Sequence, residues 1–167
     1  MKDVAENYLN LPDEMHLLSE EDIKLLKDFT KHMYLEFSKS NAFIFQKSEP
    51  YDYINNGFEK MREDSKKGFI KVSTAGDDSE LLGDYNLMFR ASHDYIHILT
   101  DATFDYEDEI LTFSATVDLF KTYCRHRKIR YNKNVENVFR SEIVYQSAFK
   151  NIHKNNVIDQ KIILRDL

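Results

Sequence analysis

Two histidines four residues apart, His93 and His97, are the residues whose spacing most directly suggests chemistry in this chain. They lie in an unusually apolar stretch, residues 85–99, that we expect to be helical. Four residues are about one helical turn, so both imidazoles lie on one helix face and can offer two nitrogens to one metal ion. Paired core histidines can also be held by hydrogen bonds to carboxylates, so the motif leaves both possibilities open.

A metal site needs further ligands, and two other predicted helices supply candidate carboxylates. Glu109, with Glu107 as its alternative, stands at the start of the next helix, near the rim of its predicted buried stripe. Acids at a helix start also fit simple stabilisation by the helix dipole. Glu142 lies in a later apolar helical stretch, where a buried carboxylate needs a positive partner such as a histidine or a bound cation.

Together these residues predict one mixed nitrogen and oxygen site. The expected metal ligands are His93, His97, Glu109 and Glu142. The expected catalytic residues, which would orient the ligands, are Asp94 and Gln146. Such a donor set suits Zn(II), Fe(II) or Mn(II) and leaves open positions at which a metal could activate water or bind oxygen. We therefore expect a metal-dependent hydrolase or oxidase.

The adjacent pair His93 and Asp94 permits a second enzymatic interpretation, because helical metal phosphohydrolases use a neighbouring histidine and aspartate. Such a site needs another histidine and a distant aspartate, for which His32 and Asp118 are the candidates. Asp118 lies beside the predicted buried stripe of its helix without other support from the sequence, which makes this the weaker of the two enzyme hypotheses.

Charge is unevenly distributed along the chain, although the net charge is −6. Residues 1–120 hold 12 Lys and Arg against 25 Asp and Glu, whereas residues 121–167 hold 11 against 4. Residues 121–133 interleave basic with aromatic side chains, as surfaces that bind nucleic acid or a phosphorylated substrate do. The anion-binding candidates are Arg125, Arg127, Lys128 and Arg130, with Lys121 and Lys133 at the ends of the cluster. Pairing with the acidic half of the chain or with a protein partner is the alternative.

Composition indicates a globular helical protein. The 167 residues are 42% hydrophobic and 13% aromatic, which suffices for one domain with a real core. Only 4 Gly and 2 Pro disfavour β architectures with many tight turns. The single cysteine, Cys124, excludes an internal disulfide, and we interpret it as a packed thiol rather than a nucleophile. No apolar run reaches the roughly 18 residues of a membrane span, so we expect no membrane contact and a cytoplasmic location.

The expected fold is mainly α, a single-domain bundle of about five helices with one or two short strands. Hydrophobic periodicity predicts helices at 19–38, 52–65, 84–100, 106–127 and 134–154. Short apolar or alternating runs predict strands at 42–46 and 68–73. Ser19 and Asp22 resemble a capping box at the first helix start. Residues 1–18 are expected to form an irregular arm, and residues 157–167 a short apolar tail.

Several segments resemble motifs of a family of uncharacterised phage and bacterial proteins. That family carries FRAxHDYxGH, then a glutamate-rich helix start, then TExxGQ, then QK before an apolar end. The matching segments here are residues 89–97, 107–109, 141–146 and 159–161, with a proline-tyrosine segment at 49–51. The resemblance covers about residues 42–165 and supports the same candidate site.

This sequence departs from the family pattern at four places. Ile96 and Tyr145 replace glycines, and residues 100–103 replace a glycine-rich loop. Ser114 stands where the family tends to place a further histidine. The resemblance implies a phage or mobile-element origin, and a location in the host cytoplasm or the virion, but no particular reaction. A non-enzymatic phage structural or host-interaction protein, whose His, Glu and Gln cluster is a core hydrogen-bond network, is therefore the alternative function.

Overall fold

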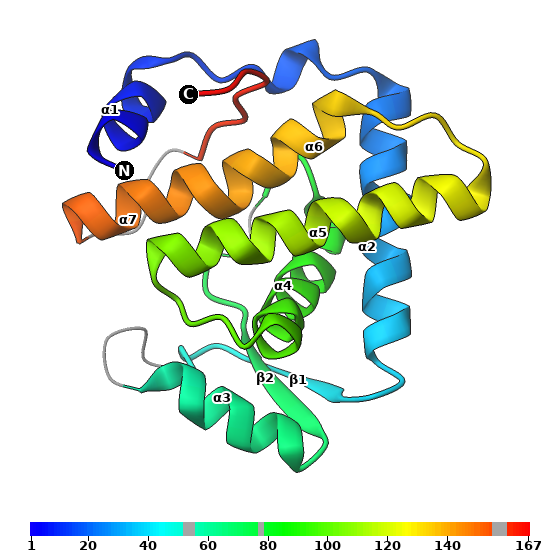
Figure 1. The fold of residues 1–167 in the computed structure, drawn as a ribbon, viewed down its shortest axis with the longest axis vertical. Helices are drawn as coiled ribbons and strands as arrows, with labels where there is room; N and C mark the ends of the chain where they lie inside the picture. The colour runs from blue at the N-terminus through cyan, green and yellow to red at the C-terminus, as the bar shows by residue number, and fades with distance from the viewer. Residues whose placement is uncertain (52–55, 77–78, 155–159) are drawn as a thin grey trace. The chain divides into compact units, whose positions relative to one another are not determined.

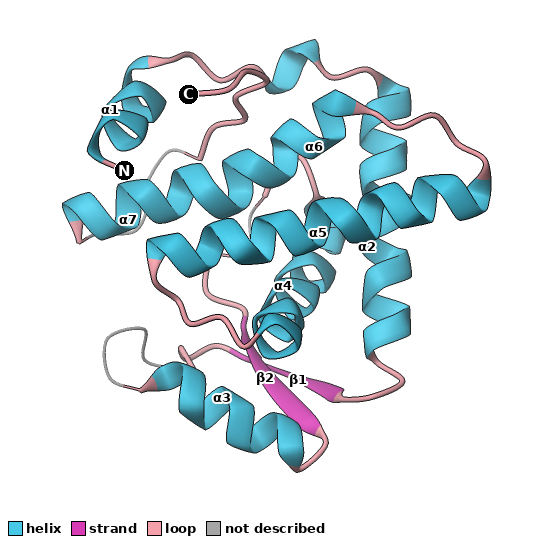
Figure 2. Ribbon diagram, viewed as in Figure 1, coloured by secondary structure: helices cyan, strands magenta, loops and turns pink. Residues whose placement is uncertain are grey.

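The computed structural model describes residues 1–51, 56–76, 79–154 and 160–167. This part of the chain is mainly helical with one two-stranded sheet (Figures 1 and 2), which confirms the predicted fold class. The chain divides into two compact units, residues 1–26 with 105–167 and residues 27–104. Among the described residues, no helix is long and apolar enough to cross a membrane.

The first unit is built on two long helical runs that lie side by side (Figure 1). One is α5 (Tyr106–Arg127). The other joins α6 (Lys133–Arg140) to α7 (Gln146–His153) through a single π-helical stretch, Ser141–Tyr145. The runs contact each other along their length. Aromatic packing in this core includes Phe120 and Phe139, whose ring centroids are 5.7 Å apart.

The N-terminal segment of the first unit contradicts one prediction. Residues 1–18 are not an irregular arm, because α1 (Lys2–Asn10) and a 3-10 turn (Met15–Leu17) occupy most of them. α1 packs against α7 and buries Ala5 and Tyr8 completely. Helical spacing of these two residues is the signal that the sequence offered, and Pro12 ends the helix rather than preventing it.

The helix α2 (Glu20–Phe37) begins in the first unit and continues into the second. Its start confirms the predicted capping box. The Ser19 backbone N–H donates to the Asp22 carboxylate at 3.0 Å, and the Asp22 N–H donates to the Ser19 hydroxyl at 3.1 Å. Two backbone donors that the helix cannot satisfy itself are thus paired, which fixes where α2 begins.

The second unit contains a parallel pair of strands linked by a helix. β1 (Ala42–Gln46) pairs in parallel with β2 (Phe69–Ser73), with Ala42 opposite Phe69. The crossover includes α3 (Gly57–Lys66), and α4 (Asn86–Thr100) follows after the 3-10 turn Gly83–Tyr85. Both α3 and α4 contact β2. The core between them is formed by Tyr51, Phe58, Met61, Ile70, Val72 and Ala91.

Most predicted elements are confirmed with small changes at their ends. Both strands and the helices near 19–38, 84–100 and 106–127 form as expected. The predicted helix at 134–154 forms as the α6–α7 run. The predicted helix at 52–65 is described only from Gly57, because residues 52–55 lie outside the described part of the chain.

Candidate functional site

The end of α4 creates a fixed partner for His97. Asp101 takes a left-handed conformation, with φ of 52°, and closes the helix. The Asp101 N–H donates to the Ile98 carbonyl and the Ala102 N–H to the His97 carbonyl, which is the Schellman arrangement. This turn brings the Ala102 carbonyl oxygen to 3.1 Å from His97 Nδ1. The local chain fold therefore holds the His97 ring.

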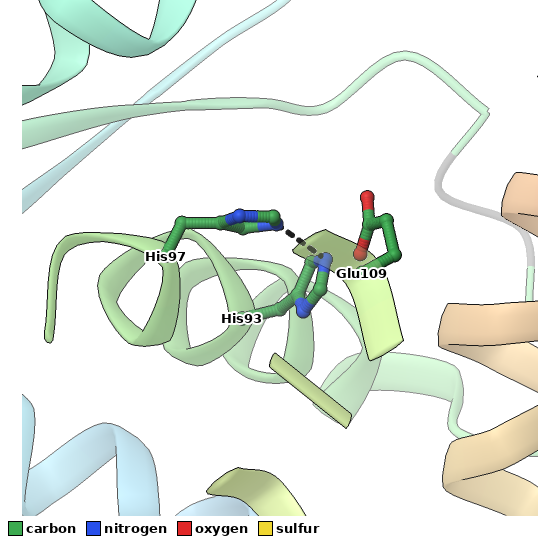
Figure 3. Close-up of side chains that lie close together, drawn as sticks. All are labelled: His93, His97 and Glu109. Carbon is green, nitrogen blue, oxygen red and sulfur yellow. Dashed lines mark hydrogen bonds between the residues drawn. The ribbon is translucent and has the colours of Figure 1, made fainter. Parts of the chain in front are cut away.

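The two histidines face each other on α4, as the four-residue spacing predicted (Figure 3). His97 Nε2 lies 3.1 Å from His93 Nε2 in a hydrogen bond, and His97 is fully buried while His93 is half-buried. Because the Ala102 carbonyl can only accept, His97 Nδ1 carries the hydrogen there. A neutral His97 then keeps its lone pair on Nε2, and His93 Nε2–H is the donor within the pair.

Aromatic rings of the same unit enclose the pair. Phe89, one turn before His93, stacks on it with a ring-centroid distance of 6.3 Å and an interplanar angle of 6°. Phe104, in the connection after α4, meets the His97 ring edge-on at 5.0 Å. Packing of this kind limits the space in which the two imidazoles can turn, which lowers the entropic cost of binding a ligand with them.

The spacing of the two Nε2 atoms suits coordination of one cation. Two nitrogens bound to zinc at about 2.0–2.1 Å lie roughly 3.3–3.4 Å apart at a tetrahedral angle. The observed separation of 3.1 Å is within a few tenths of an ångström of that value. Coordination requires only that the His93 proton move from Nε2 to Nδ1, while His97 already has the required tautomer.

Glu109 lies in the first turn of α5, and its carboxyl side chain is drawn in Figure 3. It is buried, whereas the alternative Glu107 is exposed. The Thr112 hydroxyl, one turn later, lies 2.9 Å from the Glu109 carbonyl and 3.2 Å from its carboxylate, and donates to them. Burial and this bond make Glu109 a stronger candidate than Glu107 for the predicted carboxylate ligand.

The buried face of α5 differs at its start from the predicted stripe. Ile110 was expected to face inward, but it is 39% exposed. Glu109, Thr112 and Thr116 are buried in its place, at helical spacing. Further along, Phe113 and the later apolar residues of the predicted stripe are buried as expected. The first two turns of α5 therefore have a polar buried side.

Glu142 and Gln146 share a helix face, as predicted. Gln146 Nε2 donates to Glu142 Oε2 at 2.9 Å, and both side chains are half-buried in the first unit. Asp94 is half-buried in the second unit, where its charge acts on Tyr51. Orientation of metal ligands by Asp94 or Gln146 stays a prediction.

Arg90, a neighbour of the pair in sequence, has a structural role. Its guanidinium donates to three backbone carbonyls, that of Ser73 at the end of β2 and those of Ala75 and Gly76 in the loop that follows. Gly76 has a positive φ of 62°, a conformation that favours glycine. Arg90 therefore holds this loop against α4, which is a contact that the FRAxHDY pattern did not reveal.

Three further residues singled out in the sequence analysis show no sign of a catalytic role in the structure. Asp118, the candidate of the phosphohydrolase interpretation, is exposed and pairs with Lys121 at 3.4 Å. Ser114, at the family's extra histidine position, is also exposed. Cys124 is buried, and burial raises the pKa of its thiol, as expected of a packed cysteine.

Sequence reasoning missed two groups that position the candidate ligands. Thr112 could have been found, because a threonine three residues after a glutamate can reach it within one turn. The Ala102 carbonyl could not, because nothing in the sequence marks Asp101 as the left-handed residue that places it.

Comparison of the chain with protein-family models, curated proteins and solved structures finds no match. The resemblance to the phage and bacterial family therefore stays a prediction.

Proposed function

We propose that this protein binds one divalent cation, Zn(II), Fe(II) or Mn(II), through His93, His97 and Glu109. The observation that carries the proposal is the histidine pair, whose Nε2 atoms meet at a separation of 3.1 Å. Glu109 is the carboxylate that we propose as the third ligand beside the pair. The donor set of two imidazoles and a carboxylate is common in enzymes with open metal positions.

The choice of Glu109 rests on burial and on chain connectivity. Only residues 101–105 separate α4, which carries the histidines, from the first turn of α5. Because Glu109 is buried, water would screen its attraction to a bound cation less than at an exposed carboxylate. Glu142 was expected as a further ligand, but it accepts a hydrogen bond from Gln146 and belongs to no candidate metal group among the described residues.

The proposed activity is metal-dependent hydrolysis or oxidation of a small or nucleotide-like anionic substrate. A cation held by two histidines and one carboxylate would supply an activated water or a position for oxygen. The protein would supply the orientation of the ligands. His97 is oriented by the Ala102 carbonyl and Glu109 by the Thr112 hydroxyl, so the ligands are fixed before the cation binds.

Metal analysis tests the proposal directly. Untagged protein should contain one Zn, Fe or Mn per chain by mass spectrometry, and Co(II) added to metal-free protein should give the absorption bands of a low-symmetry site. Glu109→Gln keeps the size of the side chain but removes a ligand charge. We expect it to weaken cation binding at least 100-fold, since even outer-shell changes cost roughly 10–100-fold.

Two variants control for folding and for adventitious binding. His16→Gln removes an exposed histidine outside the pair and should leave cation affinity unchanged. Thr112→Val removes the bond to Glu109 but no ligand, and should weaken binding by about 10–100-fold. Equal cation affinity in native protein and in Glu109→Gln would exclude Glu109 as a ligand. Retention of the cation by a folded His93→Ala variant would overturn the proposal.

The structure also favours a second candidate, a non-enzymatic protein in which the pair is a core hydrogen-bond network. Both ring nitrogens of His97 have protein partners, Ala102 and His93, so this buried side chain is satisfied without a cation. A bound cation would raise the melting temperature in a concentration-dependent way. Metal-free protein that melts identically with chelator and with added Zn(II) or Mn(II) would support this second function, in phage structure or host interaction.

Origin and location belong to the same proposal. A phage source, and a place in the host cytoplasm or the virion, are supported by the resemblance of residues 89–97 to the FRAxHDYxGH motif. The proposed ligand set supports a small-molecule substrate. Three protein ligands would leave a coordination position of the cation open, and a substrate or water could bind there.

A further inference from the structure

The last turn of α5 and the residues just after it carry four basic side chains that no acidic side chain in the described part of the protein neutralises. Arg125, Arg127, Lys128 and Arg130 are all exposed. Within the described residues, none of the four forms an ion pair with an acidic side chain. Lys121 and Lys133, at the ends of the cluster, do have such partners, Asp118 at 3.4 Å and Glu136 at 2.6 Å. Pairing with acidic side chains of the same chain, the alternative given by the sequence, therefore explains Lys121 and Lys133 but not the four residues between them.

The backbone at this turn shows that lysine stands where glycine would fit best. α5 ends in a Schellman arrangement, in which the Lys128 N–H donates to the Arg125 carbonyl and the Ile129 N–H to the Cys124 carbonyl. Lys128 is the left-handed residue of this motif, with φ of 57°. Side chains are disfavoured in that conformation and glycine is not. The fold therefore does not explain why position 128 carries a long cationic side chain.

The helix dipole explains only part of the charge. Cations in the last turn of a helix are stabilised by its negative end, which covers Arg125 and Arg127. Lys128 and Arg130 follow the last turn of α5, and closure of the helix uses the Lys128 backbone rather than its charged side chain. Guanidinium groups dominate the set, and these bind phosphate oxygens in a bidentate way.

The aromatic side chains of the cluster are not placed to stack on bases. Tyr123 is buried, with the Arg127 guanidinium over its ring at 5.7 Å. Tyr131 is half-buried; its ring packs on Phe120, and its hydroxyl donates to Glu136. Neither ring is presented flat to solvent, as a platform for unstacked bases would be. The exposed chemistry of the turn is cationic, with Ile129 as a single partly exposed apolar neighbour.

We infer that Arg125, Arg127, Lys128 and Arg130, the α5-end cations, bind the phosphate backbone of duplex nucleic acid. Contact through charges alone is independent of base sequence and depends steeply on salt. Up to four phosphates neutralised predict a slope of about −3.6 for log K against log salt concentration. This binding surface belongs to the first unit alone and does not depend on the proposed metal site.

Fluorescence anisotropy with a labelled 20-base-pair duplex tests the inference. The test variant combines Arg125→Gln, Lys128→Gly and Arg130→Gln in the full chain. We expect affinity at 50 mM salt to fall at least tenfold, and the salt slope to shrink to about −1. Lys128→Gly alone should weaken binding while leaving the melting temperature unchanged or raising it by about 2–4 °C, since it relieves a positive φ. Lost binding in a more stable protein cannot be assigned to misfolding.

A matched control removes three positive charges elsewhere. Lys31→Gln, Lys47→Gln and Lys66→Gln change exposed lysines outside the cluster, and together they should lower affinity less than threefold. Equal losses in the two triple variants would overturn the inference, because net charge rather than this turn would be responsible. Binding to vesicles that contain phosphatidylserine, or to a poly-glutamate peptide, but not to the duplex would also overturn it.

Discussion

At the scale of single residues, the buried hydroxyl of Tyr51 shows how a polar group is matched with partners. In the second unit the Tyr51 hydroxyl donates to Asp64 at 3.4 Å and accepts the Lys71 backbone N–H at 2.9 Å. Burial raises the pKa of Asp64, but bonds from Lys71 and Lys67 more than offset this, so its pKa lies below the ordinary value. Burial, together with the charges of Asp64 and Asp94, raises the pKa of Tyr51 to about 12.

The raised pKa of Tyr51 predicts a loss of stability at high pH. An unfolded tyrosine loses its proton near pH 10, while folded Tyr51 keeps it to about pH 12. The contribution of Tyr51 is therefore complete below pH 10 and is lost as pH rises toward 12. Denaturant midpoints measured between pH 9 and 11.5 should fall more steeply for the native protein than for Tyr51→Phe. Parallel curves for the two proteins would show that Tyr51 does not titrate in this way.

At the scale of secondary-structure elements, the ends of helices decide where side chains lie. The capping box fixes the start of α2, and left-handed residues end α4 and α5. At the end of α4 this termination also gives His97 its backbone partner. At the end of α5 it turns the chain where the α5-end cations gather.

The capping box predicts a measurable cost for losing the Ser19 hydroxyl. Ser19→Ala removes the acceptor for the Asp22 N–H and should lower the free energy of unfolding by about 0.5–2 kcal/mol. Ser114→Ala is the matched control, because the hydroxyl of this exposed serine donates within its own helix to the Ile110 carbonyl, and its effect should stay within about 0.5 kcal/mol. Urea denaturation distinguishes them, and equal values would argue against a capping role.

At the scale of the whole molecule, the two chain ends are tied together within the first unit. The Tyr8 hydroxyl accepts the Lys161 N–H at 2.8 Å, and the Glu14 carboxylate accepts the Leu164 N–H at 2.7 Å. Ser141, at the π-helical stretch, exchanges hydrogen bonds with the Ile163 backbone. The described part of the predicted apolar tail, residues 160–167, thus contributes to the core through the buried Ile162 and Ile163.

Burial of the tail predicts a large effect from one truncation in the core. Ile163→Ala should lower the free energy of unfolding by about 2–5 kcal/mol, whereas Ile129→Ala, which is 40% exposed in the native protein, should cost under about 1 kcal/mol. Hydrogen exchange should show that α1 loses more protection than β2, because only α1 shares a unit with the tail. Equal loss in both elements would mean that the units unfold as one.

The sequence by itself determined the helices from α2 onward, the strands, the cap at Ser19 and the shared face of His93 and His97, because these follow from local spacing. Only the tertiary structure decided which side of α5 is buried, since Ile110 and Glu109 are adjacent in sequence and have opposite exposure. It likewise decided that residues 1–18 contain a packed helix, because α1 is covered by α7 from the far end of the chain. Local periodicity is set by neighbouring residues, whereas burial of a polar group depends on partners that the chain brings together only when it folds.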